Sequence, residues 1–173
     1  MSDVILRPWK REDAQPLAAI ANNRNVWLNV RDTFPHPYTV MDAMQWIHQH
    51  AIEKPVQHFC IVYEGKVAGS IGVVLKDDVY RKTIEVGYFI GEPFWNKGIA
   101  TKAVGLMVEY IRNQFDVVRI FAEVFERNKA SMKVLRKNGF YLEGIRKKAV
   151  IKDNLIMDDY VWVKIIDDYK QII

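Results

Sequence analysis

The residues best suited to chemistry form a short turn at positions 96–101, between a predicted strand and a predicted helix. Apolar residues alternate over positions 85–90 as a strand requires, and Gly91 and Pro93 end that pattern. From Ala103 onward, apolar residues recur at helical spacing. The first backbone N–H groups of such a helix have no acceptor inside it. A helix N-terminus of this kind attracts anions, so the turn predicts a phosphate site.

The same turn also fits an ordinary connection from a strand to a helix, since many such loops contain one glycine. The Walker pattern would need Gly-Lys-Ser/Thr after four spacer residues, but Gly91 is followed at that distance by Asn96, Lys97 and Gly98. The sequence also lacks a GxGxxG pattern. A nucleotide triphosphatase or a Rossmann domain is therefore not supported.

The turn resembles the diphosphate loop of the GNAT acetyltransferases, whose pattern is Gln/Arg-x-x-Gly-x-Gly/Ala. Residues 95–100 follow it, except that Trp95 stands at the first position. This tryptophan, with Gly-Tyr-Phe-Ile before the loop and Ala-Thr-Lys-Ala after it, is similar to the Rim-type branch, which acetylates the N-termini of ribosomal proteins. Residues 128–131 and 138–146 resemble that branch in the same order. Two separated motifs in the right order are more specific than one.

The resemblance implies an acetyl-CoA-dependent N-acetyltransferase, in which a primary amine attacks the thioester directly. In the family, acetyl-CoA lies where the fourth strand splays from the fifth, with its diphosphate on the N–H groups of the turn. A bulge at Ile90 and Gly91 would free an N–H group for the developing oxyanion. The residues implied for acetyl-CoA binding are Phe89, Ile90, Gly91, Asn96, Lys97, Gly98, Ile99, Ala100, Thr101, Asn128 and Ser131.

Ser131 is the candidate that protonates the leaving thiolate, because the Rim-type branch has a serine three residues after the asparagine, here Asn128. Many relatives use a tyrosine for this step, at a position where this chain has Leu135. The alternative is an exposed or capping serine without a catalytic role.

Glu85 is the candidate general base, since the family often keeps a carboxylate on this strand, and desolvation in an apolar strand disfavours the charged form. It could equally be an ion-pair partner, and the amine could lose its proton to water. Glu143 belongs to the family's Glu-Gly element and is at least as well explained by a structural role. Some relatives carry an acid where this chain has Val150.

Aromatic residues gather in the irregular part of the N-terminal half, at Trp27, Phe34, Tyr38 and Trp46. They form either a satellite core or the acceptor site, because the family reads its acceptor largely through the first two helices. We expect Trp27, Phe34 and Tyr38 to contact the acceptor. The histidines show no metal-binding spacing, since positions 48 and 50 lie on different faces of a helix, so no metal is expected.

The elements that must position these residues follow the order β-α-α-β-β-β-α-β-α-β-β. Hairpins are predicted at Glu64-Gly65 and at residues 152–154, and Thr39 and Asp42 should cap a helix in which Val40, Met44, Ile47 and Ala51 share one face. The fold expected is α/β (α+β): one mixed, mostly antiparallel sheet with splayed central strands, flanked by helices. Residues 1–173 should form a single domain.

Composition limits the remaining possibilities. The net charge is only +4, and the sequence lacks the strong basic stripe of a nucleic-acid-binding protein. No apolar run is long enough to span a membrane. Cys60 is the only cysteine, which suits a reducing compartment, and we expect a cytoplasmic protein, either a monomer or a homodimer. The alternatives to a protein N-terminus as acceptor are a polyamine, an amino sugar or a drug, and a non-catalytic acyl-CoA-binding module is the alternative to an enzyme.

Overall fold

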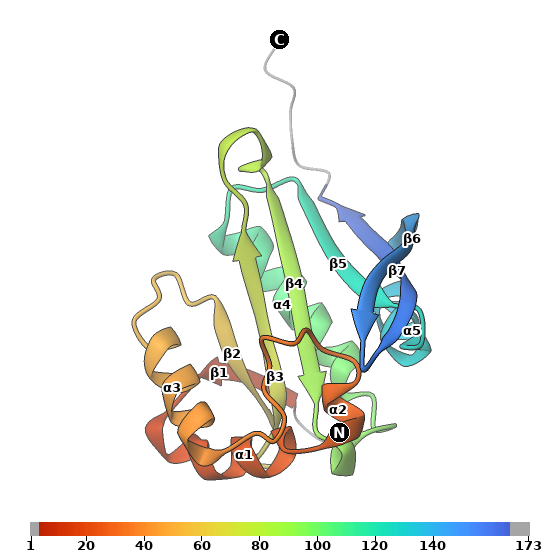
Figure 1. Cartoon of the computed structure of the whole chain (residues 1–173). Coiled ribbons are helices and arrows are strands. Elements are labelled where there is room, and N and C mark those ends of the chain that lie inside the picture. Colours follow the sequence, from red (N-terminus) through yellow and green to blue (C-terminus); the bar gives the residue numbers. More distant parts are fainter. Residues whose placement is uncertain (1–3, 167–173) are drawn as a thin grey trace.

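The computed structural model describes residues 4–166, which form one seven-stranded sheet with helices on both faces (Figure 1). The spatial order is β1-β2-β3-β4-β5-β7-β6, and every neighbouring pair is antiparallel except β4 and β5. The predicted mixed sheet is therefore confirmed. The strands are β1 (Val4–Pro8), β2 (His58–Tyr63), β3 (Lys66–Leu75), β4 (Thr83–Ile90), β5 (Arg119–Phe125), β6 (Tyr141–Lys152) and β7 (Leu155–Ile165).

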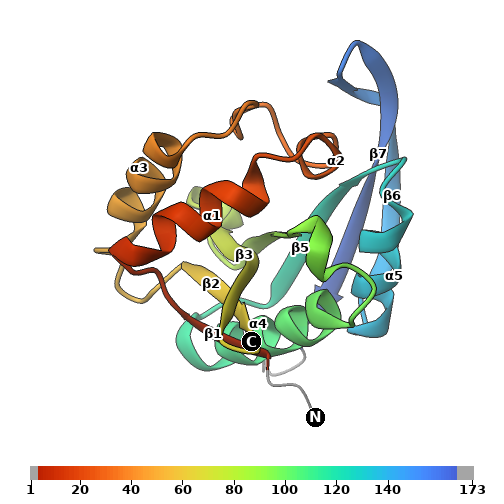
Figure 2. The same cartoon turned by 90° about the horizontal axis from the view of Figure 1, so that it is seen from below.

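The helices form two layers around this sheet (Figure 2). The helices are α1 (Ala14–Ala21), α2 (Arg24–Trp27), α3 (Val40–His50), α4 (Ile99–Gln114) and α5 (Lys129–Lys137). Helices α1 and α3 cover one face, and α4 and α5 cover the other. Within residues 4–166 there is no helix with both the length and the apolar character needed to cross a bilayer.

Strand β2 is buried on both faces, so its side chains pack against both helix layers. Phe59 and Ile61 pack with the α4 cluster, whereas Cys60 and Val62 pack with the cluster of α1 and α3. Successive side chains of a strand point to opposite faces, so an unbroken apolar run is what a doubly covered strand needs. Cys60 is core, as the sequence indicates, and burial raises the pKa of its thiol to about 12.

The central strands β4 and β5 pair only at their beginnings, through Thr83–Arg119, Ile84–Ile120 and Glu85–Phe121. Beyond these pairs β5 continues along β7 as far as Phe125. The two strands diverge towards their carboxyl ends in Figure 1. This is the predicted splay, and it opens the sheet beside the second half of β4.

Local signals in the sequence set most element boundaries correctly. The hairpin turns lie at Glu64-Gly65 and Asp153-Asn154, all with positive φ, and Thr39 and Asp42 form the predicted capping box of α3. The predicted inward face of α3 is partly wrong: Ala43 and Ile47 are buried, whereas Met44 is 38% exposed.

Candidate active site

The turn before α4 has the backbone that an anion site needs. Gly98 precedes the helix with φ of 75°, and Lys102 N donates to Gly98 O at 3.1 Å as the first helical hydrogen bond. The N–H groups of Ile99, Ala100 and Thr101 therefore precede the first intrahelical donor and have no acceptor inside α4. The positive end of the helix dipole points in the same direction.

A groove of about 430 Å³ runs along α4 from this turn. It is lined by Gly98, Thr101, Lys102, Gly105, Leu106, Glu109, Lys137 and Asn138. Lys102 and Lys137 give it positive charge beside the free N–H groups. Lys97 lies elsewhere, with its ammonium 5.5 Å from the Phe94 ring and 5.7 Å from the Tyr63 ring.

Trp95, which departs from the usual loop pattern, attaches the turn to β4. Its indole Nε1 donates to the carbonyl of Ile90 at 2.7 Å. Asn96 follows with φ of 62°, so the chain reverses between the strand end and the helix. The tryptophan therefore fixes where the helix N-terminus lies relative to the splay.

The bulge expected at Ile90 and Gly91 is absent. The ladder between β3 and β4 keeps its register as far as Gly69–Ile90, and Gly91 N then donates to Ala68 O at 2.9 Å. Because peptide groups alternate sides along a strand, the N–H of Ile90 points away from β3 and into the splay. The divergence of β4 from β5, rather than a bulge, releases this donor.

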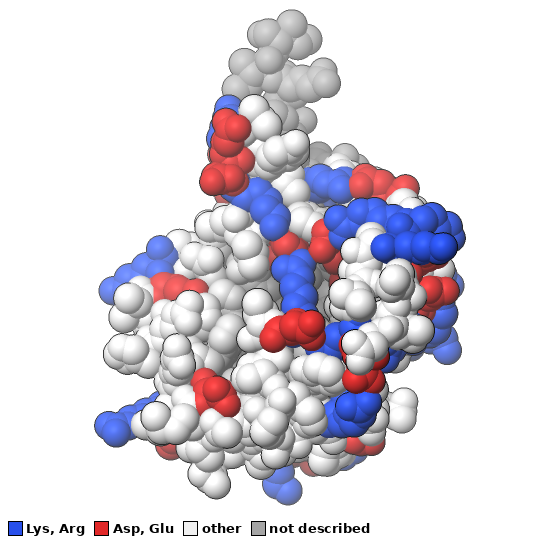
Figure 3. Space-filling model, in the orientation of Figure 1, with Lys and Arg blue, Asp and Glu red and all other residues white. Residues whose placement is uncertain are grey.

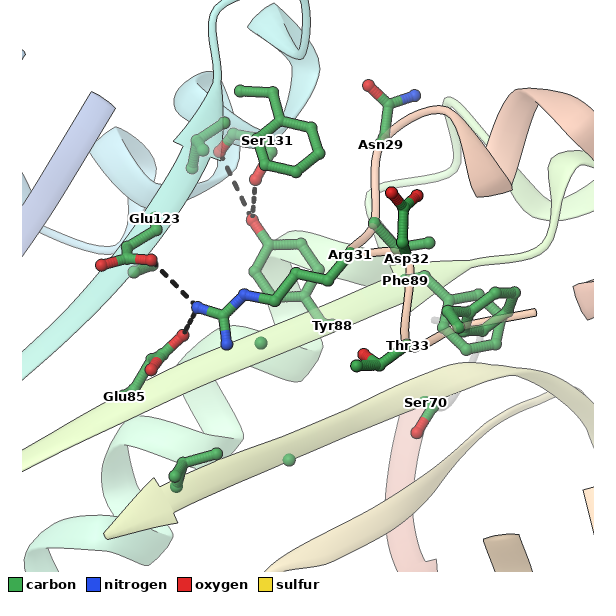
Figure 4. Close-up of a pocket in the computed structure, with 18 of the residues that line it drawn as sticks. Asn29, Arg31, Asp32, Thr33, Ser70, Glu85, Tyr88, Phe89, Glu123 and Ser131 are labelled. Carbon is green, nitrogen blue, oxygen red and sulfur yellow. Dashed lines mark hydrogen bonds and ion pairs between the residues drawn. The ribbon is translucent and has the colours of Figure 1, made fainter. Parts of the chain in front are cut away.

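Ser131 lies at the start of α5, where its backbone N donates to the Asn128 side chain at 3.1 Å. Asn128 is therefore the N-cap of α5. The Ser131 hydroxyl shares a hydrogen bond of 2.8 Å with the hydroxyl of Tyr88 on β4 (Figure 4). Burial raises the pKa of Tyr88 to about 12. Leu135 is fully buried in the core.

Tyr88 was not predicted as a site residue. Its position in the alternation on β4 made it look like core, and it does pack partly against the core. Only the approach of α5 across the splay brings its hydroxyl to Ser131. The one signal in the sequence was a polar hydroxyl within an otherwise apolar strand face.

Glu85 is held by two cations. Its Oε1 accepts from Arg31, and its Oε2 accepts from Lys76 Nζ at 2.7 Å. Arg31 also donates to Glu123 on β5 at 2.9 Å, so that it reaches between the two diverging strands (Figure 4). This arrangement matches the ion-pair alternative for Glu85. Glu143 forms a two-bond pair with Arg119, at 2.5 and 2.6 Å.

A larger cavity of about 1000 Å³ opens beside β4, on the face covered by α1 and α3. Glu85, Phe89, Asn128 and Ser131 all line it, so the splay leads directly into it. Acidic and basic side chains meet along the middle of this face (Figure 3). The charged residues that line the cavity are Arg31, Asp32, Asp42, Glu85, Glu123, Arg146, Lys152 and Asp159.

The three aromatic residues expected at the acceptor divide into two groups. Phe34 and Tyr38 line the large cavity, and Phe34 packs edge-on against Phe89 at 5.3 Å between ring centroids. Trp27 is not among the lining residues. Its ring stacks on His36 at 5.5 Å and lies 3.7 Å from Lys152 Nζ.

Comparison with known proteins supports the family suggested by these features. The family model described as "Acetyltransferase (GNAT) domain" matches residues 3–141. The probable N-acetyltransferase YjcK of Bacillus subtilis is 34% identical over 128 residues, which cover 71% of this chain and 70% of that protein.

Two further relatives differ in the acceptor that their names give. The spermidine N(1)-acetyltransferase of Escherichia coli is 28% identical over 142 residues, covering 82% of this chain and 74% of that protein. The crystal structure of a ribosomal-protein-S5-alanine acetyltransferase from Vibrio fischeri is 25% identical, with a TM-score of 0.80 over 98% of this chain and 99% of that one. With the helix N-terminus, the groove and the splay in place, the chain belongs to the GNAT family and is an N-acetyltransferase that uses acetyl-CoA.

Proposed function

We propose that the chain transfers the acetyl group from acetyl-CoA directly to the primary amine of a protein N-terminus, as in the Rim-type branch. The observation that carries this is the large cavity, which Glu85, Phe89, Asn128 and Ser131 line where β4 has separated from β5, together with the helix N-terminus of α4 that follows the same strand. The diphosphate binds the turn, the thioester lies in the splay, and the acceptor enters from the cavity.

In this proposal the N–H groups of residues 97–101 hold the diphosphate, and Lys102 and Lys137 add positive charge. The pantetheine arm passes Phe89, Ile90 and Gly91 towards Asn128 and Ser131. The N–H of Ile90 stabilises the oxyanion that forms when the amine attacks the thioester carbon. Both substrates are bound together, so no acyl-enzyme forms.

Collapse of the tetrahedral intermediate breaks the carbon–sulfur bond and releases a thiolate that needs a proton. Ser131 is the proposed donor, and its hydrogen bond to Tyr88 provides a second hydroxyl that can replace the proton it gives up. The amine loses its own protons to solvent or to Glu85. Glu85 can take that role only after Arg31 and Lys76 release its carboxylate.

The volume of the cavity supports a peptide acceptor. At about 1000 Å³ it is at the upper end of the range for small-ligand sites, which leaves room for more than a single small amine. Four buried or half-buried acids line it, Asp42, Glu85, Glu123 and Asp159. A small polycation such as a polyamine is the second candidate, and it would have to compete with Arg31 and Arg146, which already pair with three of these acids.

The test is thiol release from acetyl-CoA with matched acceptors. Peptides with a free N-terminus should stimulate release of CoA thiol, and the same peptides blocked at the N-terminus should not. Spermidine and free amino acids are tested in the same assay as alternative acceptors. Stimulation by spermidine alone would transfer the assignment to the second candidate. Release that no amine raises above hydrolysis of acetyl-CoA would reject both.

The proton donor is tested with single variants under saturating substrate. Ser131→Ala should keep the affinity for acetyl-CoA and lower turnover by about 100-fold or more, the usual effect of a positioned acid. Tyr88→Phe should lower turnover less, because Ser131 remains. If Ser131→Ala instead loses acetyl-CoA affinity at normal turnover, the serine is a binding contact and not the donor.

A further inference from the structure

Three side chains outside the active site converge at one point although the sequence separates them. His50 ends α3, Glu53 lies in the loop that follows, and His58 begins β2. The Nδ1 atoms of His50 and His58 lie 2.6 and 2.8 Å from the same oxygen, Oε1 of Glu53. Donor atoms of all three residues lie within 4.8 Å of one another. The sequence predicted no metal site, since positions 48 and 50 lie on different faces of a helix.

The carboxylate of Glu53 is oriented by the backbone. Its Oε2 accepts from the N–H groups of Gln57 and His58, both at 3.1 Å. Oε1 faces both imidazoles, and Nδ1 of His58 also lies 3.1 Å from Oε2. Ligands held in this way by outer hydrogen bonds are typical of metal sites, because the carboxylate needs little further ordering.

The two imidazole rings also have prepared positions. A Cβ on Gly72 of β3 would lie 2.2 Å from Cδ2 of His58, so only glycine leaves room for this ring. The ring of Trp46 lies 4.0 Å from that of His50 and packs edge-on against His58 at 5.2 Å, measured between centroids. The three donor side chains are only 10 to 15% exposed.

Hydrogen bonding within the described residues leaves one nitrogen of this cluster unpaired. The two Nδ1 atoms share one carboxylate oxygen, whereas Nε2 of His50 is buried without a partner among residues 4–166.

We propose that His50, Glu53 and His58 bind a divalent transition-metal ion, best matched by Zn²⁺, with water as the fourth ligand. Two imidazole nitrogens and one carboxylate oxygen are a ligand set that Zn²⁺ takes in proteins. Tetrahedral bonds of about 2.0–2.1 Å separate neighbouring donors by about 3.3 Å. The present separations of 2.6 and 2.8 Å must therefore widen by about 0.5 to 0.7 Å, which small rotations of the side chains achieve.

The ion would connect the end of α3 to the start of β2 at the wall of the acceptor cavity. Trp46, Gln49 and His58 all line that cavity. The metal therefore has a structural role, in which it holds the α3 wall in place, and it takes no part in acetyl transfer. The inference is independent of which amine the enzyme acetylates.

The test uses the full-length, tag-free protein, stripped with a chelator and titrated with Zn²⁺ in a calorimeter. We expect one ion per chain and a higher melting temperature with Zn²⁺. Glu53→Gln and His58→Asn should each weaken binding by more than about 100-fold, since even outer-shell partners of a metal are worth 10- to 100-fold. His48→Asn, an exposed histidine on the same helix, is the matched control and should bind as wild type.

A measurement on the wild-type protein guards against variants that fail to fold. Co²⁺ bound in place of Zn²⁺ should give the visible absorption of a four-coordinate site, and Zn²⁺ should abolish it. Absence of binding by the wild-type chain in excess Zn²⁺ would overturn the proposal. So would equal binding by Glu53→Gln, or loss of binding in His48→Asn, because either result would assign the ion to other surface groups.

Discussion

Glu85 has both carboxylate oxygens engaged by cations, and this arrangement governs the effect of removing its charge. We expect Glu85→Gln to lower the free energy of unfolding by about 1 kcal/mol, a modest value because Arg31 is more than half exposed and water replaces part of the interaction. The acidic limb of the pH–rate profile should stay in place. Denaturant unfolding and rate profiles of both proteins measure this.

A matched control is Glu143→Gln, which breaks the pair with Arg119 in the other half of the sheet. If Glu85→Gln moves the acidic limb while Glu143→Gln does not, and stability is unchanged, Glu85 is the base and the ion-pair role is wrong.

The second prediction concerns Gly98, where glycine is required by the backbone conformation and not by a lack of space for a side chain. Gly98 and Gly65 both have φ of 75°, and a Cβ on either would meet no atom within 4 Å. Alanine at either position should therefore lower stability by about 1 kcal/mol, the strain of a left-handed residue. Only Gly98→Ala should also weaken acetyl-CoA binding, by about tenfold or more, because a displaced N–H group loses a hydrogen bond to a charged phosphate.

Calorimetric titration of both variants with acetyl-CoA measures the difference. Equal affinity in Gly98→Ala and Gly65→Ala would show that the diphosphate binds elsewhere.

At the residue scale, sequence reasoning found what local patterns encode. The turn at Gly98 follows from its neighbours in the chain, whereas Asn128 was expected only through the family resemblance. Tyr88 and the His50–Glu53–His58 cluster do not follow from local patterns, because each depends on contacts between segments that the sequence keeps apart. His50 ends a helix and His58 begins a strand, so no regular spacing in the sequence indicates that the two side chains meet.

At the scale of elements, α3 forms one wall of the large cavity, and its N-terminal cap helps to hold it in place. Thr39 Oγ1 accepts from Asp42 N at 3.2 Å, and Thr39 N donates to Asp42 Oδ2 at 2.7 Å. Thr39→Ala should lower the free energy of unfolding by about 1 kcal/mol, as expected for loss of a capping side chain. Thr39→Ser keeps the hydroxyl and should restore most of it, and urea unfolding of the two variants measures this. Equal loss in both would mean that the methyl group, not the cap, carries the effect.

The buried face of α3 differs from the face that the spacing of its apolar residues predicts. The periodicity of large apolar residues selected Met44, whereas the helix packs through Ala43 and Ile47. Helix α1 presents Ala14, Ala18 and Ala21 to the same cluster. Small residues allow two helices to approach closely, and a pattern weighted by hydrophobic size underestimates them.

At the scale of the whole molecule, the response to acid should depend partly on Asp13. Arg7 donates to its two oxygens at 2.6 and 2.8 Å, and Lys10 N donates at 2.9 Å. Burial would raise the pKa of Asp13, but these hydrogen bonds outweigh it and hold that pKa below its ordinary value. A lowered folded-state pKa gives stability that is present above the unfolded-state pKa and is lost as pH falls through the folded-state value.

Asp13→Asn should therefore be less stable than wild type by about 2 kcal/mol at pH 7, because Arg7 is left without its buried partner. The difference should shrink as pH falls below about 4, where the carboxyl of the unfolded wild-type chain begins to be protonated while that of the folded chain is still ionised. Melting temperatures between pH 7 and pH 3 measure this. A constant difference across that range would mean that the charge of Asp13 contributes nothing.

The order of elements along the chain could be predicted, but their order across the sheet could not. The last hairpin joins β5 through β7, and β6 becomes the edge. Either strand of a hairpin can in principle pair with β5, and the choice depends on long-range packing that no local pattern records. The splay was expected only through the family resemblance.

The short pairing of β4 with β5 divides the sheet into two antiparallel blocks, one from residues 4–90 and one from residues 119–165. Three residue pairs form the seam between them. A substrate lying in the splay would contact both blocks where strand pairing is missing and would resist their rotation about that seam. Bound acetyl-CoA would then restrict rotation of the two blocks about the seam, and release of the product would remove that restriction.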